Sequence, residues 1–184
     1  MPVTALDDKS ALIVVDLQKG IAAFPTLRPL DEVVENTNLL SEAFRERCLP
    51  VVLVVAAGGS PGRTQVPARH MGLPADFSEL LPSLAVGPDD LHVTKFARGA
   101  FSKTELETYL NTRGITQVVI TGVATSNGVE STARQAYEAG LNVTLATDAM
   151  TDGNAEAEAY SLTRVFPKIA ELGRAREIVD LLPR

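Results

Sequence analysis

Residues 117–137 read QVVITGVATSNGVESTARQAY, and they give the clearest indication of the fold class. Its first seven residues form a largely apolar run, which is typical of a strand buried inside a sheet. A short turn of small and polar residues follows, and residues 128–139 are then expected to form a helix. A strand that leads through a tight turn into a helix is the repeating unit of α/β proteins with a parallel sheet.

Further strands and helices are predicted on both sides of this stretch. Residues 11–15 (ALIVV) and 51–57 (VVLVVAA) are continuous apolar runs of strand length. Between them, residues 30–47 carry apolar side chains at helical spacing with a polar opposite face. Apolar strands separated by amphipathic helices predict a parallel sheet covered on both faces. The other predicted strands are 91–95, 141–147 and 168–172, and the other predicted helices are 103–112, capped by Ser102, 154–166, ended by Pro167, and 176–182.

The chain is predicted to be one α/β domain. Its 184 residues fit a single core, and neither an internal repeat nor a linker divides them. Residues 57–90 are rich in Gly and Pro and form a long irregular connection between two strands. Such a connection is often a lid or a binding loop, but an inserted surface loop is an equally good interpretation.

Composition excludes several classes of function. With 17 Lys and Arg against 23 Asp and Glu, the net charge of −6 disfavours nucleic acids and anionic membranes as partners. The N-terminus MPVTALDDKS has neither a basic leader nor a long apolar stretch. The one cysteine, Cys48, cannot form an internal disulfide, so we expect a cytoplasmic location. Two histidines, His70 and His92, are too few for a histidine-rich metal site.

Candidate functional residues follow the predicted strands directly. In an open parallel sheet, ligands bind outside the carboxyl ends of the strands. Asp16 follows the first strand, Lys95 closes the third, and Asp148 follows residues 141–147. The turn of residues 124–128 begins a helix at the same edge. An acid, a base and a helix N-terminus are therefore expected to meet at one edge of the sheet.

Each of these residues also has a structural interpretation. Asp16 could simply cap a backbone group or form an ion pair, without a role in function. A single lysine such as Lys95 is usually a solvated surface charge. Gly128 could simply permit close packing of helix on strand. Asp148, before AMTDG, is better explained as a structural carboxylate than as a catalyst. Arg63, Arg69 and Arg98 could bind a carboxylate through two hydrogen bonds, although most arginines are simply exposed.

Three blocks in order give the chain a family resemblance. ALIVVDLQKG (11–20), VTKFARGAFSKTELETYL (93–110) and VVITGVATSNGVESTARQAYEAG (118–140) resemble the isochorismatase-like hydrolase superfamily, and the similarity spans about residues 8–182. The resemblance implies a single three-layer α/β/α domain, residues 1–184, with a mainly parallel six-stranded sheet. It also implies a small-molecule substrate and a homo-oligomer, a dimer or a tetramer, whose neighbouring subunit often completes the site.

Most members of that superfamily use an Asp–Lys–Cys triad, and this chain lacks the cysteine. By resemblance, Asp16 matches the aspartate and Lys95 the lysine, whereas Gly128 stands where the cysteine should be. Cys48 is no replacement, because it follows a helix at the opposite edge of the sheet. Ser126, two residues before the glycine, is expected to point elsewhere on the turn.

The resemblance assigns further features to the site. The family's cis peptide before the nucleophile matches Val123–Ala124, and Gln18, Arg98, Phe101 and Ala124 are expected to contact the substrate. The metal ligands of nicotinamidases are missing from AAGGSPGRTQ (56–65). Neither a metal nor another cofactor is therefore expected.

Without a thiolate, acyl chemistry on amides should be lost. Isochorismatases also carry glycine at this position, and they cleave a vinyl ether by acid catalysis without an enzyme nucleophile. Asp16 is the natural proton donor, since burial would raise its pKa, although a close Lys95 would lower it.

The chain also departs from isochorismatases. It has Ala57 and Gly58 where they tend to have glutamine and proline, and its turn ATSNG and block KFARGAF are closer to the cysteine hydrolases. Two hypotheses follow: a hydrolase of isochorismate or a related carboxylate that acts through Asp16, and a vestigial cysteine-hydrolase homologue that binds a small molecule without catalysis.

Overall fold

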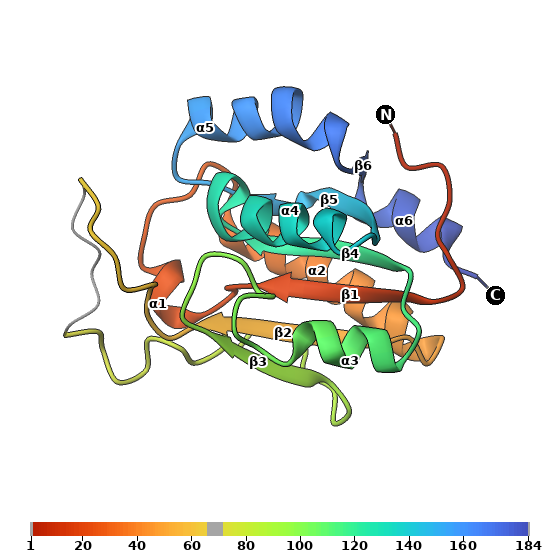
Figure 1. Ribbon diagram of the computed structural model, residues 1–184, viewed down its shortest axis with the longest axis horizontal. Coiled ribbons are helices and arrows are strands. Elements are labelled where there is room, and N and C mark those ends of the chain that lie inside the picture. The colour runs from red at the N-terminus through yellow and green to blue at the C-terminus, as the bar shows by residue number, and fades with distance from the viewer. Residues whose placement is uncertain (1, 66–71, 184) are drawn as a thin grey trace.

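The computed structural model of this chain describes residues 2–65 and 72–183. In this described part, one six-stranded sheet runs through the molecule in the order β3-β2-β1-β4-β5-β6, and every neighbouring pair is parallel (Figure 1). The predicted α/β domain with a six-stranded sheet is thus confirmed, and the sheet is parallel throughout. The strands are β1 (Ser10–Val15), β2 (Val51–Ala56), β3 (Leu91–Lys95), β4 (Gln117–Val123), β5 (Asn142–Thr151) and β6 (Glu171–Gly173).

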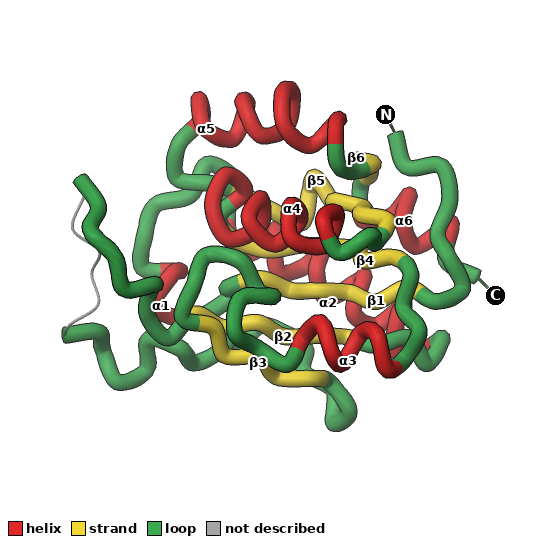
Figure 2. The backbone as a smooth tube through the Cα atoms, in the orientation of Figure 1, coloured by secondary structure: helices red, strands yellow, loops and turns green. Residues whose placement is uncertain are grey.

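The helices connect these strands and vary in type (Figure 2). Two segments predicted as α-helix are mixed: a π-helical turn precedes α4, and a π-helical turn and a 3₁₀ turn extend α5. The helices are α1 (Lys19–Ala22), α2 (Leu30–Glu46), α3 (Leu106–Thr112), η1 (Thr125–Val129, π), α4 (Glu130–Glu138), α5 (Ala155–Tyr160), η2 (Ser161–Val165, π), η3 (Phe166–Lys168, 3₁₀) and α6 (Ala175–Leu181).

Two hydrophobic clusters divide the core between the faces of the sheet. On one face, α3 and α4 pack against alternate strand residues such as Ile13 and Ile120. On the other, α2 and α6 pack against residues such as Leu12 and Val119 (Figure 1). Because both faces are covered, the strands are apolar on both sides, and the burial of β4 is complete along its length. The three-layer α/β/α arrangement is confirmed.

Predicted boundaries differ from the structure at α3, β5 and β6, and one short helix was not predicted. Strand β6 begins at Glu171, because residues 166–168 form the 3₁₀ turn η3. Helix α3 begins at Leu106, and Ser102 does not cap it, because its hydroxyl oxygen accepts a hydrogen bond from the Gln135 side chain. Strand β5 does not end before Asp148 but continues to Thr151, because a register shift opposite β4 absorbs the extra residues. The short helix α1 was not predicted, since its four residues carry no amphipathic pattern.

The strand order reverses between β1 and β4. Chain connections leave β1 toward β2 and β3 on one side, whereas β4, β5 and β6 continue on the other. In α/β proteins, ligands tend to bind where the strand order reverses, outside the carboxyl ends of the two central strands. Asp16 follows β1 and the turn of η1 follows β4, so the candidate residues lie at this position.

Candidate active site

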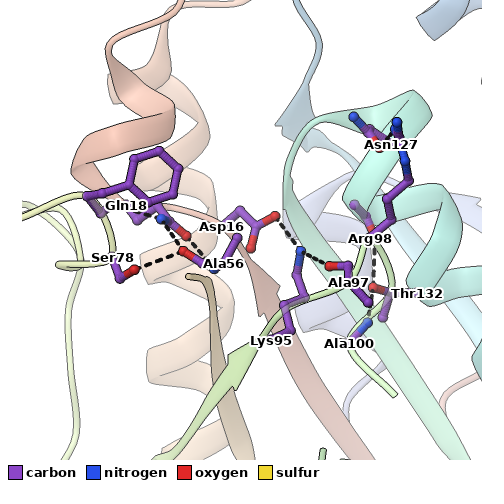
Figure 3. Close-up of polar contacts among 12 residues, drawn as sticks. Asp16, Gln18, Ala56, Ser78, Lys95, Ala97, Arg98, Ala100, Asn127 and Thr132 are labelled. Carbon is purple, nitrogen blue, oxygen red and sulfur yellow. Dashed lines mark hydrogen bonds and ion pairs between the residues drawn. The ribbon is translucent and has the colours of Figure 1, made fainter. Parts of the chain in front are cut away.

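Asp16 and Lys95 form a buried ion pair at the carboxyl edge of the sheet. The Lys95 Nζ lies 2.8 Å from Asp16 Oδ2, and the two side chains are only 2% and 8% exposed (Figure 3). Lys95 comes from β3, two strands away from β1, and its long side chain passes the end of β2, where the neighbouring residue is the small Ala56. The prediction that these two charges meet is confirmed in the structure, although their roles in a reaction stay predictions.

Asp16 is held in an unusual state. Its backbone has a φ of 55°, a left-handed conformation that few non-glycine residues adopt. Within the described part of the chain, its Oδ1 is buried without a hydrogen-bond partner. Burial away from water raises the pKa of this carboxyl to about 6, against the opposing effect of the Lys95 charge and hydrogen bond. Of the two opposing effects expected from the sequence, burial is therefore the stronger.

Gly128 lies directly beside this carboxyl. A Cβ placed on it would come within 3.0 Å of Asp16 Oδ2 and 3.1 Å of Val15 Cγ1. The position matched to the family cysteine therefore adjoins the ion pair, as the resemblance implies. Because Gly128 has no side chain, the acid faces a backbone surface at this point and not a thiol.

The turn that carries Gly128 is a single π-helical turn, Thr125–Val129. The preceding peptide, Val123–Ala124, is cis, as expected from the resemblance. The Ser126 hydroxyl donates a 2.7 Å hydrogen bond to the Asp152 carboxylate, away from Asp16, in agreement with the expectation that Ser126 points elsewhere.

The loop after Lys95 is attached to this turn through α4. The Ala100 N–H donates to the Thr132 hydroxyl, which itself donates to the Gly128 carbonyl at 2.7 Å (Figure 3). The Phe101 N–H donates to Gln135 on the next turn of the helix. The two chain segments that carry Lys95 and Gly128 are therefore joined as one unit.

The predicted substrate-binding residues differ in their surroundings. Arg98 is exposed and its guanidinium donates to the Asn127 side chain (Figure 3). Phe101 and Ala124 are partly buried. A substrate contact of Arg98, Phe101 or Ala124 stays a prediction.

Gln18 has a structural role, and the substrate contact expected of it stays a prediction. It is fully buried, its amide nitrogen donates to the carbonyls of Ala56 and Phe77, and its amide oxygen accepts from the Ala56 N–H (Figure 3). These contacts occupy both N–H groups of the amide and one lone pair of its oxygen. Gln18 fastens the segment around Phe77 to the ends of β1 and β2, and the Phe77 ring covers Gly20.

The connection of residues 57–90 is irregular in its described parts, 57–65 and 72–90, as predicted. The Lys19 N–H donates to the Glu79 carbonyl and the Leu81 N–H to the Leu17 carbonyl, so the end of the connection runs along residues 17–20. Arg63 is exposed, whereas Arg69 lies outside the described residues.

Asp148 lies within β5 and has the structural role preferred for it. Its Oδ1 accepts the Ala175 N–H at 2.7 Å and its Oδ2 accepts from Arg174 at 3.3 Å, at the start of α6. Cys48 is exposed after the end of α2, at the amino end of β2, far from Asp16 along the strands.

Neither a metal site nor a membrane-spanning helix is found in the part of the chain that the structure describes. Over residues 2–65 and 72–183, no group of three or more His, Cys, Asp or Glu side chains is arranged to hold a metal ion. In the same ranges, no helix is both long and apolar enough to cross a membrane. The predictions about oligomeric state, partners and location are not tested by these observations.

Sequence reasoning missed Asp152, which the structure places behind the active-site turn. Asp152 is buried and its carboxylate accepts both the backbone N–H and the hydroxyl of Ser126. Residues 148–153 were assigned to no strand or helix, and a carboxylate in a connecting segment usually faces solvent. The one sequence feature that could have indicated Asp152 is its position directly after a strand. That position was not recognised, because β5 was predicted to end at residue 147 and not at Thr151.

The chain is similar to known proteins over almost its whole length. Residues 10–177 match the model of the isochorismatase domain. The Bacillus subtilis isochorismatase family protein YwoC is 36% identical over 182 residues, which cover 94% of this chain and 93% of the relative. The Escherichia coli O157:H7 family protein YecD is 35% identical over 181 residues, with 94% and 96% covered. A solved isochorismatase family structure from Burkholderia thailandensis superimposes with a TM-score of 0.92 at 39% identity, and 97% of each chain is covered.

Three findings agree with one another: the match to the isochorismatase domain, the relatives that are 35% and 36% identical, and the superimposable fold. Together they establish the coarse identity that the three sequence blocks suggested. The chain belongs to the isochorismatase family of hydrolases.

Proposed function

We propose that this protein hydrolyses a small vinyl ether carboxylate, isochorismate or a close relative, by acid catalysis from Asp16 without a cysteine nucleophile. The observation that carries the proposal is the buried carboxyl of Asp16, whose pKa is raised to about 6 and which lies beside Gly128 where a thiol would otherwise stand. A carboxyl with such a pKa is still partly protonated at neutral pH, as a general acid must be.

The reaction needs a proton donor and a water molecule. The protonated Asp16 gives its proton to the terminal CH₂ carbon of the vinyl ether, and the electron pair of the double bond forms the new C–H bond. Water adds to the resulting oxocarbenium carbon and loses a proton, which restores the acid. The hemiketal then breaks its C–O bond to release pyruvate and the alcohol.

Lys95 would help Asp16 to give up its proton. Its ammonium lies 2.8 Å from Asp16 Oδ2, so it stabilises the carboxylate that proton transfer creates. An interaction that strengthens as charge develops lowers the barrier of the step. In a buried site the same interaction is stronger than it would be in water.

Gly128 supports a mechanism without covalent catalysis. A side chain there would lie against both Asp16 and Val15. Because Gly128 has no side chain, the reacting end of a planar substrate is free to approach the Asp16 carboxyl. Thioester chemistry, which needs a thiolate at this place, is not expected.

The test is pyruvate release from isochorismate, measured by a coupled assay near pH 6 with a chelator present. We expect turnover by the unaltered protein and a loss on the order of 10³-fold in Asp16→Asn, because the amide keeps the shape but cannot donate the proton. Asp180→Asn, an exposed aspartate on α6, is the matched control and should leave turnover unchanged.

Absence of turnover in the unaltered protein with isochorismate would overturn that substrate. In that case, binding of isochorismate without turnover, seen by calorimetry, would favour the vestigial binding protein. Turnover that survives in Asp16→Asn would overturn the role of Asp16.

A further inference from the structure

We infer that Asp152 is a positioning residue that holds the active-site turn, Thr125–Val129, against the acid Asp16. The carboxylate of Asp152 is 5% exposed and sits directly after β5. Its Oδ2 accepts the Ser126 N–H and the Ser126 hydroxyl, each at 2.7 Å, and its Oδ1 accepts the Asn154 N–H at 3.0 Å. The kinetic part of this inference rests on the proposed function.

The turn needs such a partner because of its geometry. The first N–H groups of a helical turn have no acceptor within the helix, and they attract negative charge. In this turn the N–H groups of Asn127 and Val129 reach the Ala124 carbonyl, at 3.0 and 3.2 Å. The Ser126 N–H bonds to the Asp152 carboxylate instead. Bonds to a charged acceptor are about twice as strong as neutral ones, so Asp152 is the strongest attachment of the turn's first residues.

The effect of Asp152 reaches Asp16 through two residues of rigid backbone. Gly128 follows Ser126 in the same π turn, and its backbone lies against the Asp16 carboxyl. Val129, the last residue of the turn, is fully buried. If the turn shifted outward, water would reach Asp16, and the burial that sets its proton affinity would be lost.

Charged groups from several elements surround this turn. Lys95 of β3 pairs with Asp16, and Arg98 of the following loop binds Asn127. Glu158 of α5 accepts from the Thr125 hydroxyl at 3.1 Å. Each of these groups touches the turn or the acid at a different atom from Asp152, so their effects can be separated by substitution.

A matched control lies at the start of α4. Glu130 accepts a 2.6 Å hydrogen bond from the Ser161 hydroxyl and pairs with Arg134 on its own helix. Glu130→Gln removes the charge that pairs with Arg134 and weakens the bond from Ser161, but it leaves the bonds to Ser126 in place. It therefore tests whether loss of a neighbouring carboxylate charge at the start of α4 has the same result.

The experiment measures the pKa of the Asp16 carboxyl by a carbon-13 NMR titration of the side chain. In Asp152→Ala we expect that pKa to fall by roughly one unit, because the loosened turn admits water. Ser126→Ala, which removes one of the two donors, should shift it in the same direction by less. Asp152→Asn keeps an oxygen acceptor for Ser126 and should restore part of the shift, while Glu130→Gln should leave the pKa unchanged.

Kinetics provide the second readout. Asp152→Ala should lower kcat on the order of 10- to 100-fold with little change in KM, since the acid is displaced and not the bound substrate. An unchanged Asp16 pKa in a folded Asp152→Ala protein would overturn the inference, as would an equal shift in Glu130→Gln. If Asp152→Ala does not fold, Ser126→Ala decides the matter by the same titration. Because the titration needs no turnover, its result is independent of the proposed reaction.

Discussion

Two buried aspartates on parallel strands of this sheet have opposite surroundings. Asp16 follows β1 and Asp148 lies in β5, and they are 6% and 8% exposed. Both oxygens of Asp148 are bonded, one to the first N–H of α6 and one to Arg174. Asp16 has one oxygen on Lys95 and, within the described residues, leaves the other without a partner.

The difference shows how to tell a structural carboxylate from a reactive one. A buried oxygen without a partner is costly, and nothing in the packing of β1 requires it. Asp148 fixes α6 onto β5, so its negative charge is compensated by the fold. Asp16 keeps a buried oxygen without a partner among the described residues, and burial of its carboxyl raises its pKa to about 6.

The largest effect is expected when the positive charge of Lys95 is removed from beside Asp16. In Lys95→Met we expect the pKa of Asp16 to rise above about 6, since the Lys95 charge and hydrogen bond both lower it. Turnover should fall on the order of 10²- to 10³-fold, because the carboxylate left after proton donation loses its stabilising charge. The pH dependence of kcat/KM measures both changes. The loss of activity with rising pH reports the deprotonation of Asp16, and a basic limb that moves to lower pH in Lys95→Met would contradict this account of the pair.

The next effect is on stability and concerns Asp16 alone. Its folded-state pKa of about 6 exceeds the ordinary 3.8, so the folded protein binds this proton more tightly than the unfolded chain does. The free energy of unfolding should therefore fall as pH rises from about 4 to about 6, by up to about 3 kcal/mol from this group. Urea unfolding at several pH values measures it. The Asp16→Asn protein should lack this contribution, and an identical pH profile in both proteins would refute it.

The smallest effect is expected when the structural aspartate, Asp148, is replaced. Asp148→Ala removes the acceptor for the Ala175 N–H at the start of α6, which should cost about 1 to 2 kcal/mol of stability. A thermal melt should show Tm lower by a few degrees. Turnover per folded molecule should stay unchanged, because Asp148 bonds to α6 and not to the site. A loss of turnover without a loss of stability would erase the distinction drawn between the two aspartates.

The sheet and the central ion pair could be predicted because they follow from local patterns. Apolar runs such as 11–15 and 117–123 have few alternatives to a buried parallel strand. The carboxyl ends of such strands share one edge, which brings Asp16 and Lys95 together whatever the loops do. The glycine beside them was identified through the family resemblance.

The contacts that complete the site could not be predicted, since each depends on packing between distant segments. Gln18 bonds to Phe77, 59 residues away, and Asp152 bonds to Ser126, 26 residues away. Neither pairing has a periodic signal. The length of β5 was also underestimated, because polar residues such as Asp148 interrupt its apolar pattern while the ladder continues past a bulge.

The position of Cys48 makes it suitable for labelling or attaching the protein at one site. It is the only thiol among the 184 residues, it is exposed, and it lies at the amino end of β2, one strand length from the edge that carries Asp16. A six-residue strand spans roughly 20 Å. A maleimide dye or a surface linker would therefore attach to a single defined point, and an immobilised molecule would present the edge that carries Asp16 outward.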